Sequence, residues 1–287
     1  FRAPSLAQQN YSTTSTVFIS SVPYEVRTFP VTSAVGQAFG AEPLKAEKSV
    51  NYGLGLVVEP TDSTAITLDA YQIRIGNRIV LSENLTGDAV TAYLTAHGFP
   101  GVTGGRYFTN AVDTRTRGVD LVGSWRTGLG AGDLDLTLGY NYNKTDITHT
   151  RPNPEILAQN GLDLQRIGRT ETGRITVGAP RDKLTLGGRW TLGAFSLDSQ
   201  LARYGRFTTL STTPANDQTF SPNWVLDLAL NYQVERWTLT LGSDNVGNRY
   251  PDRVIFANST SGILPYSSSS PYGFNGAYVY GKAAYRW

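Results

Sequence analysis

The residues with the clearest potential for chemistry are arginines that gather in two neighbouring polar segments of the chain. The candidates are Arg151, Arg166, Arg169, Arg174 and Arg203. An arginine side chain presents a planar, permanently charged fork that binds carboxylates and other oxyanions through paired hydrogen bonds. Together these residues predict a basic vestibule that attracts an anionic ligand. The competing hypothesis is structural, and in it the arginines pair with carboxylates such as Glu155, Asp163 and Glu171.

Other chemistry has little support in the sequence. The chain has two histidines, His97 and His149, far apart in polar segments, and it has no cysteine. We therefore predict no catalytic residue, no resident metal and no cofactor, although ligation of iron or haem by one histidine stays an alternative. The glycine-rich stretch 128–132 lies between two alternating segments, so it predicts a turn rather than a dinucleotide site.

Strict alternation of apolar and polar residues dominates the rest of the chain. Nine strands are expected, near 47–59, 66–75, 119–126, 133–143, 181–192, 195–201, 226–232, 237–241 and 274–287. Such alternation means that the two faces of a sheet meet different solvents. Asp120, Asp135, Asp227 and Asn231 are expected on the polar face. In the second strand the alternation slips at Tyr71, which predicts a bulge.

The connections between the expected strands alternate between short turns and long loops. Short turns are expected at 60–63, 128–132, 192–194 and 235–236, and long polar loops near 78–105, 147–174, 205–222 and 245–272. Outer-membrane barrels have short turns on the periplasmic side and long loops outside. No run approaches the roughly 18 apolar residues of a membrane helix, and a net charge of +2 gives no case for nucleic acid. We predict an all-β, antiparallel transmembrane barrel, with residues 1–45 in an extracellular loop and about nine strands in 46–287.

Several motifs resemble those of TonB-dependent outer-membrane receptors. The motifs are Phe1-Arg2-Ala3-Pro4-Ser5, Leu44-Lys45-Ala46-Glu47-Lys48-Ser49, Thr116-Arg117-Gly118-Val119-Asp120-Leu121, Asp244-Asn245-Val246 with Tyr250-Pro251, and the closing stretch 272–287. Ala46 replaces the usual proline. The resemblance implies the C-terminal portion of a 22-stranded barrel with a plugged lumen. Nine is odd, whereas bacterial single-chain barrels have even strand numbers, so we expect the chain to be a fragment, with the plug, the TonB box and the first strands upstream.

The resemblance also implies function and partners. It implies a transport receptor of the bacterial outer membrane that is not an enzyme and imports a scarce nutrient, most often a ferric siderophore or similar iron complex, with energy relayed by TonB. Tyr285 and Trp287 would be the signal for the barrel-assembly machinery, and the arginines could instead bind lipopolysaccharide phosphates among the membrane lipids. A passive porin-like or adhesin barrel and an outer-membrane barrel hydrolase stay alternatives.

Overall fold

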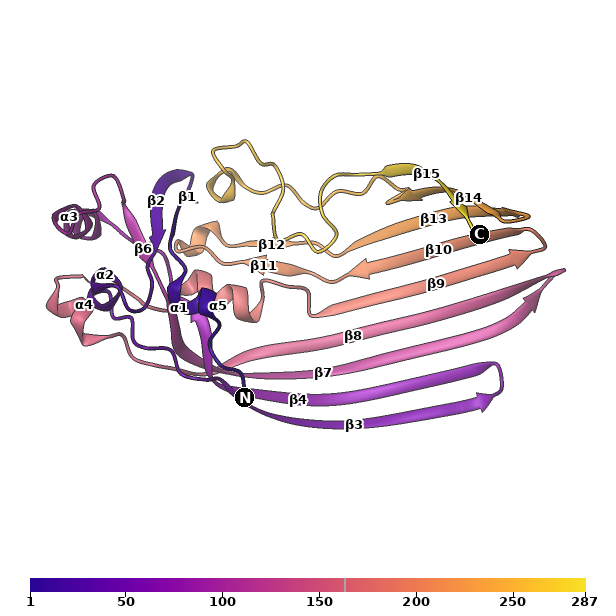
Figure 1. Ribbon diagram of the computed structural model, residues 1–287, viewed down its shortest axis with the longest axis horizontal. Helices are drawn as coiled ribbons and strands as arrows, with labels where there is room; N and C mark the ends of the chain where they lie inside the picture. The colour runs from indigo at the N-terminus through magenta and orange to yellow at the C-terminus, as the bar shows by residue number, and fades with distance from the viewer. Residues whose placement is uncertain (163) are drawn as a thin grey trace.

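The computed structural model describes residues 1–162 and 164–287, and its largest element is an antiparallel sheet of nine long strands (Figure 1). In pairing order the strands are Tyr278–Tyr285 (β15), Trp237–Asp244 (β14), Asn223–Val234 (β13), Phe195–Tyr204 (β10), Asp182–Leu192 (β9), Gly132–Thr150 (β8), Phe108–Leu129 (β7), Thr64–Leu81 (β4) and Lys48–Thr61 (β3). Each strand pairs with its sequence neighbour in the sheet, which confirms the predicted antiparallel arrangement of nine strands. Within the described residues, no helix is long and apolar enough to cross a membrane.

The two faces of the sheet differ as the alternation predicts. One face carries apolar side chains that are exposed to the surroundings, among them Leu54, Trp125 and Leu241, which are 79%, 49% and 63% exposed. The other face is polar, and Asp120 and Asn141 are direct cross-strand partners on it. An exposed apolar face of this size is what a bilayer covers in a membrane barrel. The apolar face is called the outward face below, and the polar face is called the concave face.

The predicted bulge at Tyr71 is wrong. Strand β4 keeps a regular register with β7 from Thr64 to Ile75, and its irregularities fall later, between Ile75 and Val80. Tyr71 lies opposite Gly118 on the concave face, and a Cβ on Gly118 would clash with the tyrosine ring. The ring of Tyr71 therefore covers Gly118 on the concave face. In the sequence, an aromatic residue on the polar face looks like a switch of faces, although the strand itself stays regular.

All four predicted turns join the strands at one end of the sheet, and the long connections gather at the other end (Figure 1). These connections, with the N-terminal segment, form what we call the loop layer: residues 1–47, 82–107, 151–162, 164–181, 205–222 and 245–277. Its helices are Leu6–Asn10 (α1), Ala34–Ala38 (α2), Asp88–Ala96 (α3), Glu155–Gln159 (α4), Arg169–Thr176 (α5) and the 3-10 turns Pro214–Asn216 (η1) and Phe256–Asn258 (η2). Its strands are Thr13–Ile19 (β1), Val22–Thr28 (β2), Leu85–Thr86 (β5), Gly104–Arg106 (β6), Phe207–Thr209 (β11) and Gln218–Phe220 (β12).

The main apolar core of the described residues lies in the loop layer and not on the large sheet. Phe29, Phe39, Leu94 and Tyr107 are at most 3% exposed, and the rings of Phe29 and Phe39 pack edge to face at 5.9 Å. Helix α3 contributes Val90 and Leu94 to this core. Segments from the N-terminus and from two long connections therefore stabilise one another, and they form a compact cover at one end of the sheet.

The closing strand is shorter than predicted. The large sheet takes in Tyr278–Tyr285, while the predicted strand began at residue 274. The ring of Tyr285 packs on that of Trp237 with centroids 5.0 Å apart, and the backbone amide of Arg286 still donates to the carbonyl of Arg236 at 2.9 Å. Trp287 is 97% exposed. The aromatic residues at this end lie beside the short turns, where an interfacial girdle is expected.

Candidate functional site

A ladder of charged and polar side chains crosses the concave face near the short turns. Arg126 Nε donates to Asp135 Oδ1 at 2.7 Å, and Arg189 donates to both carboxylate oxygens of Asp198, at 2.5 and 3.1 Å. Asn231 Nδ2 donates to the same carboxylate at 2.8 Å. Asp135 is the cross-strand partner of Arg189, so the two bonded groups lie side by side across β7 to β13. The ladder is largely open to solvent, so its ion pairs contribute little to the stability of the sheet.

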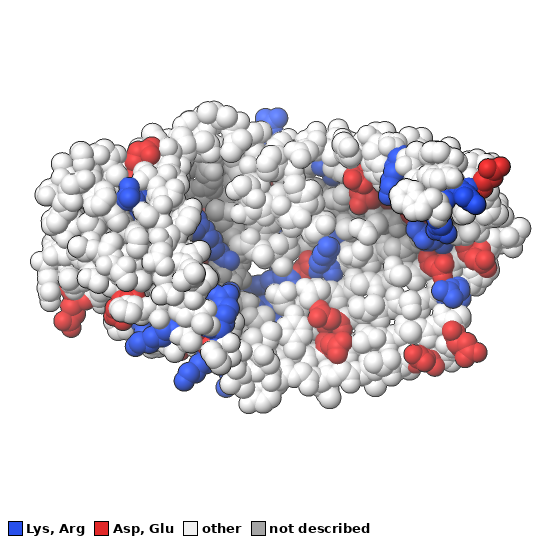
Figure 2. Space-filling view, in the orientation of Figure 1, with Lys and Arg blue, Asp and Glu red and all other residues white. Residues whose placement is uncertain are grey.

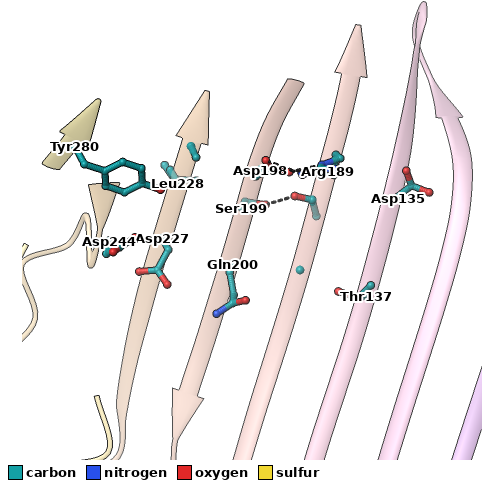
Figure 3. A pocket seen from close by; sticks show the side chains of 13 residues that line it. Asp135, Thr137, Arg189, Asp198, Ser199, Gln200, Asp227, Leu228, Asp244 and Tyr280 are labelled. Carbon is teal, nitrogen blue, oxygen red and sulfur yellow. Dashed lines mark hydrogen bonds and ion pairs between the residues drawn. The ribbon is translucent and has the colours of Figure 1, made fainter. Parts of the chain in front are cut away.

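A hollow of about 580 Å³ lies over the ladder and extends across β8, β9, β10, β13, β14 and β15. Its labelled side chains come from six neighbouring strands, and Asp198 and Arg189 point toward each other (Figure 3). Asp135, Asp198, Asp227 and Asp244 line it together with Arg189. Carboxylates outnumber cations here, so this part of the concave face favours a cationic or hydrogen-bond-donating partner.

A second cavity of about 480 Å³ lies in the loop layer, between α5, β11, β12 and residues 254–269. Hydroxyl groups from threonines and serines line it, Phe220 and Tyr266 contribute aromatic rings, and Arg174 contributes a cation. In the view of Figure 2, the surface is hollowed between the loop layer and the sheet, and basic side chains stand around the hollow. Hydroxyls, rings and a single cation form a lining that suits a polar ligand with an anionic group.

The five arginines that the sequence predicted as one vestibule are not brought together. Arg174 lines the loop cavity, and Arg169 lies on the same helix, where it pairs with Asp217. Arg166 is 5% exposed, and its guanidinium donates to the carbonyl of Pro152 at 2.6 Å. Arg151 donates to the side chain of Asn77. Arg166 therefore joins two parts of one long connection, and Arg151 joins that connection to β4.

Arg203 has a different position from the other four. Arg203 lies an even number of residues from Leu201 and Leu197 on β10, so the three side chains share one face of the strand. Its cross-strand partners are Leu184 and Trp224. Its guanidinium pairs with Asp182 on the neighbouring strand. The side chain therefore lies on the outward face at the loop end of the sheet, away from the concave face.

The predicted pairing with loop carboxylates is present in part. Arg174 forms an ion pair with Glu171, which is 6% exposed, whereas no contact links these arginines to Glu155 among the described residues, and Asp163 lies outside them. The sequence did not indicate the partners that Arg169 and Arg203 use, Asp217 and Asp182. Both partners are distant in sequence, and only the strand register and the loop packing bring them close.

The buried carboxylate of Glu83 caps the N-terminus of helix α5. Glu83 Oε2 accepts hydrogen bonds from the backbone amides of Thr170 and Glu171, at 3.2 and 3.3 Å, which satisfies two free N–H groups of the first turn. Burial raises the pKa of Glu171 to about 7; Arg174 opposes this rise, Glu83 adds to it, and Arg106 opposes it. Glu171 is therefore partly protonated near neutral pH, which changes the charge beside the one arginine of the loop cavity.

The histidines form no shared site in the structure. His97 ends α3, its ring stacks on Tyr93 with centroids 4.0 Å apart, and His149 lies exposed near the end of β8. Within the described part of the chain, no three His, Cys, Asp or Glu side chains cluster as a metal site would require.

The fold and the two faces define the class of this protein: it is part of the wall of an outer-membrane β-barrel, with its long loops folded into a cover. The sequence matches the family described as TonB dependent receptor-like, beta-barrel, over residues 1–246. The chain therefore belongs to this family, whose members are bacterial outer-membrane receptors and are typically not enzymes. No curated protein matches the chain.

Solved structures show the same fold at low sequence identity. A variant of the ferric enterobactin receptor PfeA from Pseudomonas aeruginosa is 16% identical with a TM-score of 0.56, and the match covers 98% of this chain and 36% of that one. The FrpB iron transporter from Neisseria meningitidis is 14% identical with a TM-score of 0.55, covering 85% and 32%. The outer-membrane transporter YddB from Escherichia coli is 13% identical with a TM-score of 0.54, covering 84% and 33%. The chain thus spans about a third of the length of these proteins.

Proposed function

We propose that the chain is the C-terminal portion of a 22-stranded receptor barrel, and that it supplies the ligand-binding cover and part of the wall of an active importer. The observation that carries this proposal is the loop cavity, a hydroxyl-lined space of about 480 Å³ with Arg174 in its wall, held by helix α5 at the loop end of the sheet. Pockets of 300–1,000 Å³ are the size that binds small molecules.

The cargo that we propose is an anionic iron complex of the siderophore type. Arg174 offers it a charge-assisted hydrogen bond, and Tyr266 offers an aromatic ring, while Phe220 is buried against Phe207 and supports the wall from behind. The names of two structurally similar proteins, a ferric enterobactin receptor and an iron transporter, support iron as the cargo. Their identities of 16% and 14% leave the chemistry of the complex to experiment.

The energy source and the assembly partners that we propose are those typical of the family. We propose that TonB drives import through a plug that sits against the concave face, where the carboxylate-rich hollow over β8 to β13 offers it acceptors. We further propose that Tyr285 and Trp287, at the short-turn end of the closing strand, are recognised by the barrel-assembly machinery.

The test uses the full-length receptor in cells that lack their other iron receptors. Thr209→Trp fills the loop cavity, and Thr95→Trp places the same bulk on the exposed side of α3 as a matched control. Radiolabelled iron is supplied as a panel of defined siderophore complexes, in cells with and without TonB. We expect at least one complex to enter only when TonB is present, with uptake lost in Thr209→Trp and kept in Thr95→Trp. Uptake that is independent of TonB, or equal in the two variants, would refute the proposal.

A further inference from the structure

Helix α5 separates the loop cavity from a buried group of charged side chains. Thr170, Arg174 and Gly178 line the cavity and recur every four residues, so they belong to one side of the helix and of the residues that follow it. Glu171 is buried on an adjoining side of the same turn. The helix therefore stands between a space of ligand size and a carboxyl group that water hardly reaches.

Arg174 connects the two sides of this helix. Its guanidinium pairs with the carboxylate of Glu171, and its side chain is 56% exposed, whereas the side chain of Glu171 is 8% exposed. Among the described residues, Glu171 is the only side chain that pairs with Arg174. A guanidinium presents several N–H donors in one plane, so donors remain for a ligand in the cavity. The cation in the cavity wall is therefore shared between a buried carboxylate and any anion that enters.

The charges that act on the carboxyl group of Glu171 come from three elements. Arg174 lies on α5 itself, Glu83 lies in the connection that follows β4, and Arg106 lies on β6. Strands β8 and β11 also pack against α5, but within the described part of the chain neither supplies a charge that acts on this group. When both carboxyl groups are ionised, their two negative charges balance the two arginines.

An anion in the cavity would disturb this balance. It would add negative charge beside Arg174 and compete with Glu171 for the same guanidinium, and the repulsion between charges is strong where water is excluded. A proton on Glu171 removes one negative charge and leaves Arg174 to the anion. Burial already raises the pKa of Glu171 to about 7, so the proton is readily acquired near neutral pH. The anion would raise this pKa further, because a nearby like charge disfavours the ionised carboxylate.

We propose that an anionic ligand that binds in the loop cavity takes up a proton at Glu171, so that binding is strongest in mildly acidic surroundings. This regulation rests on the proposed function, in which an anionic iron complex occupies the cavity. The proton comes from solvent and joins a carboxylate oxygen, and no other covalent bond changes. Affinity stays high below about pH 7 and falls above it, because binding must then be accompanied by protonation. If binding raises the pKa by about one unit, affinity at pH 8 is roughly fivefold lower than at pH 6, and a larger rise brings the ratio toward about tenfold.

The test measures binding of a ferric tris-catecholate, a strongly anionic iron complex, to the full-length receptor by isothermal titration calorimetry. Titrations at pH 6 and pH 8, in two buffers of different ionisation enthalpy, give both the affinity and the number of protons taken up. Glu171→Gln removes the ionisation, and Glu155→Gln makes the same change in the exposed first turn of α4 as a matched control. Wild type and Glu155→Gln should bind about five- to tenfold more weakly at pH 8 and take up roughly half a proton or more there, whereas Glu171→Gln should show neither effect.

Hydrogen exchange at α5 in the same samples separates charge coupling from loss of the helix. We expect α5 to stay protected by more than about tenfold at pH 8, so that it is folded in most molecules. Equal pH dependence in wild type and Glu171→Gln, or binding without proton uptake, would overturn this proposal alone. An α5 that is unfolded in most of the free receptor at pH 8 would overturn it too, because unfolding would then weaken binding by itself. Absence of tris-catecholate binding at every pH would contradict the proposed function as well.

Discussion

The titration of Glu171 should weaken α5 as the pH rises. Glu171 is 6% exposed in the first turn of the helix, and its carboxyl group faces Arg174, Glu83 and Arg106. Burial raises the pKa of Glu171 from 4.5 to about 7. A carboxyl group whose pKa is higher in the folded state binds its proton more tightly there, so the folded state is favoured at low pH. That stability is complete below pH 4.5 and is lost as the pH rises to about 7.

The size of the effect follows from the shift. Each pKa unit is worth about 1.4 kcal/mol, so complete ionisation of Glu171 costs the local structure about 3 kcal/mol. The ion pair with Arg174 is already included in this value, because it opposes the rise. Between pH 5 and pH 8 the opening equilibrium of α5 should therefore move by roughly 100-fold.

Hydrogen exchange measured by mass spectrometry on the full-length receptor can test this. Protection factors, corrected for the intrinsic pH dependence of exchange, are compared for the peptide that contains α5. Wild type should lose roughly 100-fold protection between pH 5 and pH 8. Glu171→Gln keeps the size of the side chain and removes its ionisation, so its protection should be nearly constant over the same range.

A peptide from the β13–β14 hairpin reports on the barrel itself and serves as the internal reference. Protection of α5 that stays constant or increases with pH in wild type would refute this role of Glu171. The same slope in Glu171→Gln as in wild type would refute it too, because another group would then be titrating.

Three other perturbations address packing and membrane orientation. Phe39→Ala should cost the loop layer about 3–5 kcal/mol, because it empties a fully buried site; exchange at α2 and α3 should rise while the sheet keeps its protection. Gly242→Ala should destabilise the sheet by about 1–3 kcal/mol in urea unfolding, since the new Cβ would clash with the ring of Tyr280, and Tyr280→Ala in the same chain should recover most of that loss. Single cysteines at Asp62 and Ser268 should be labelled from opposite sides of the outer membrane, because the first lies in a short turn and the second in the loop layer.

Specific outcomes would contradict these three expectations. Equal exchange increases in loop layer and sheet after Phe39→Ala would mean that the layer has no separate stability. Additive effects of Gly242→Ala and Tyr280→Ala would show that the clash between the new Cβ and the tyrosine ring does not cause the loss. Labelling of both cysteines by the same membrane-impermeant reagent in intact cells would contradict the assignment of the two ends.

Most of the sheet could be predicted because residue alternation and turn residues can be recognised within a single strand or turn. The period of two in a stretch such as Leu134 to Tyr142 depends only on which face meets lipid, and the glycines near 128–132 mark a turn by themselves. The loop layer was not predictable in the same way. Residues 1–45 read as a polar loop, yet β2 pairs with β6 from a different connection, and Phe29 and Phe39 join the main core. Such pairing depends on contacts between segments that the sequence separates.

The sequence by itself determined the two-faced strands, their number and order, the ends at which turns and loops gather, and the family. These properties depend on residue type and spacing along one strand, so they can be predicted without knowledge of the rest of the fold. Only the tertiary structure decided which charges meet. It placed Arg174 in the loop cavity beside Glu171, buried Arg166 among carbonyls, and directed Arg203 outward. Side chains that stand close in the sequence of a loop can end on opposite sides of a wall, because strand register and loop packing, rather than spacing along the chain, determine where each one points.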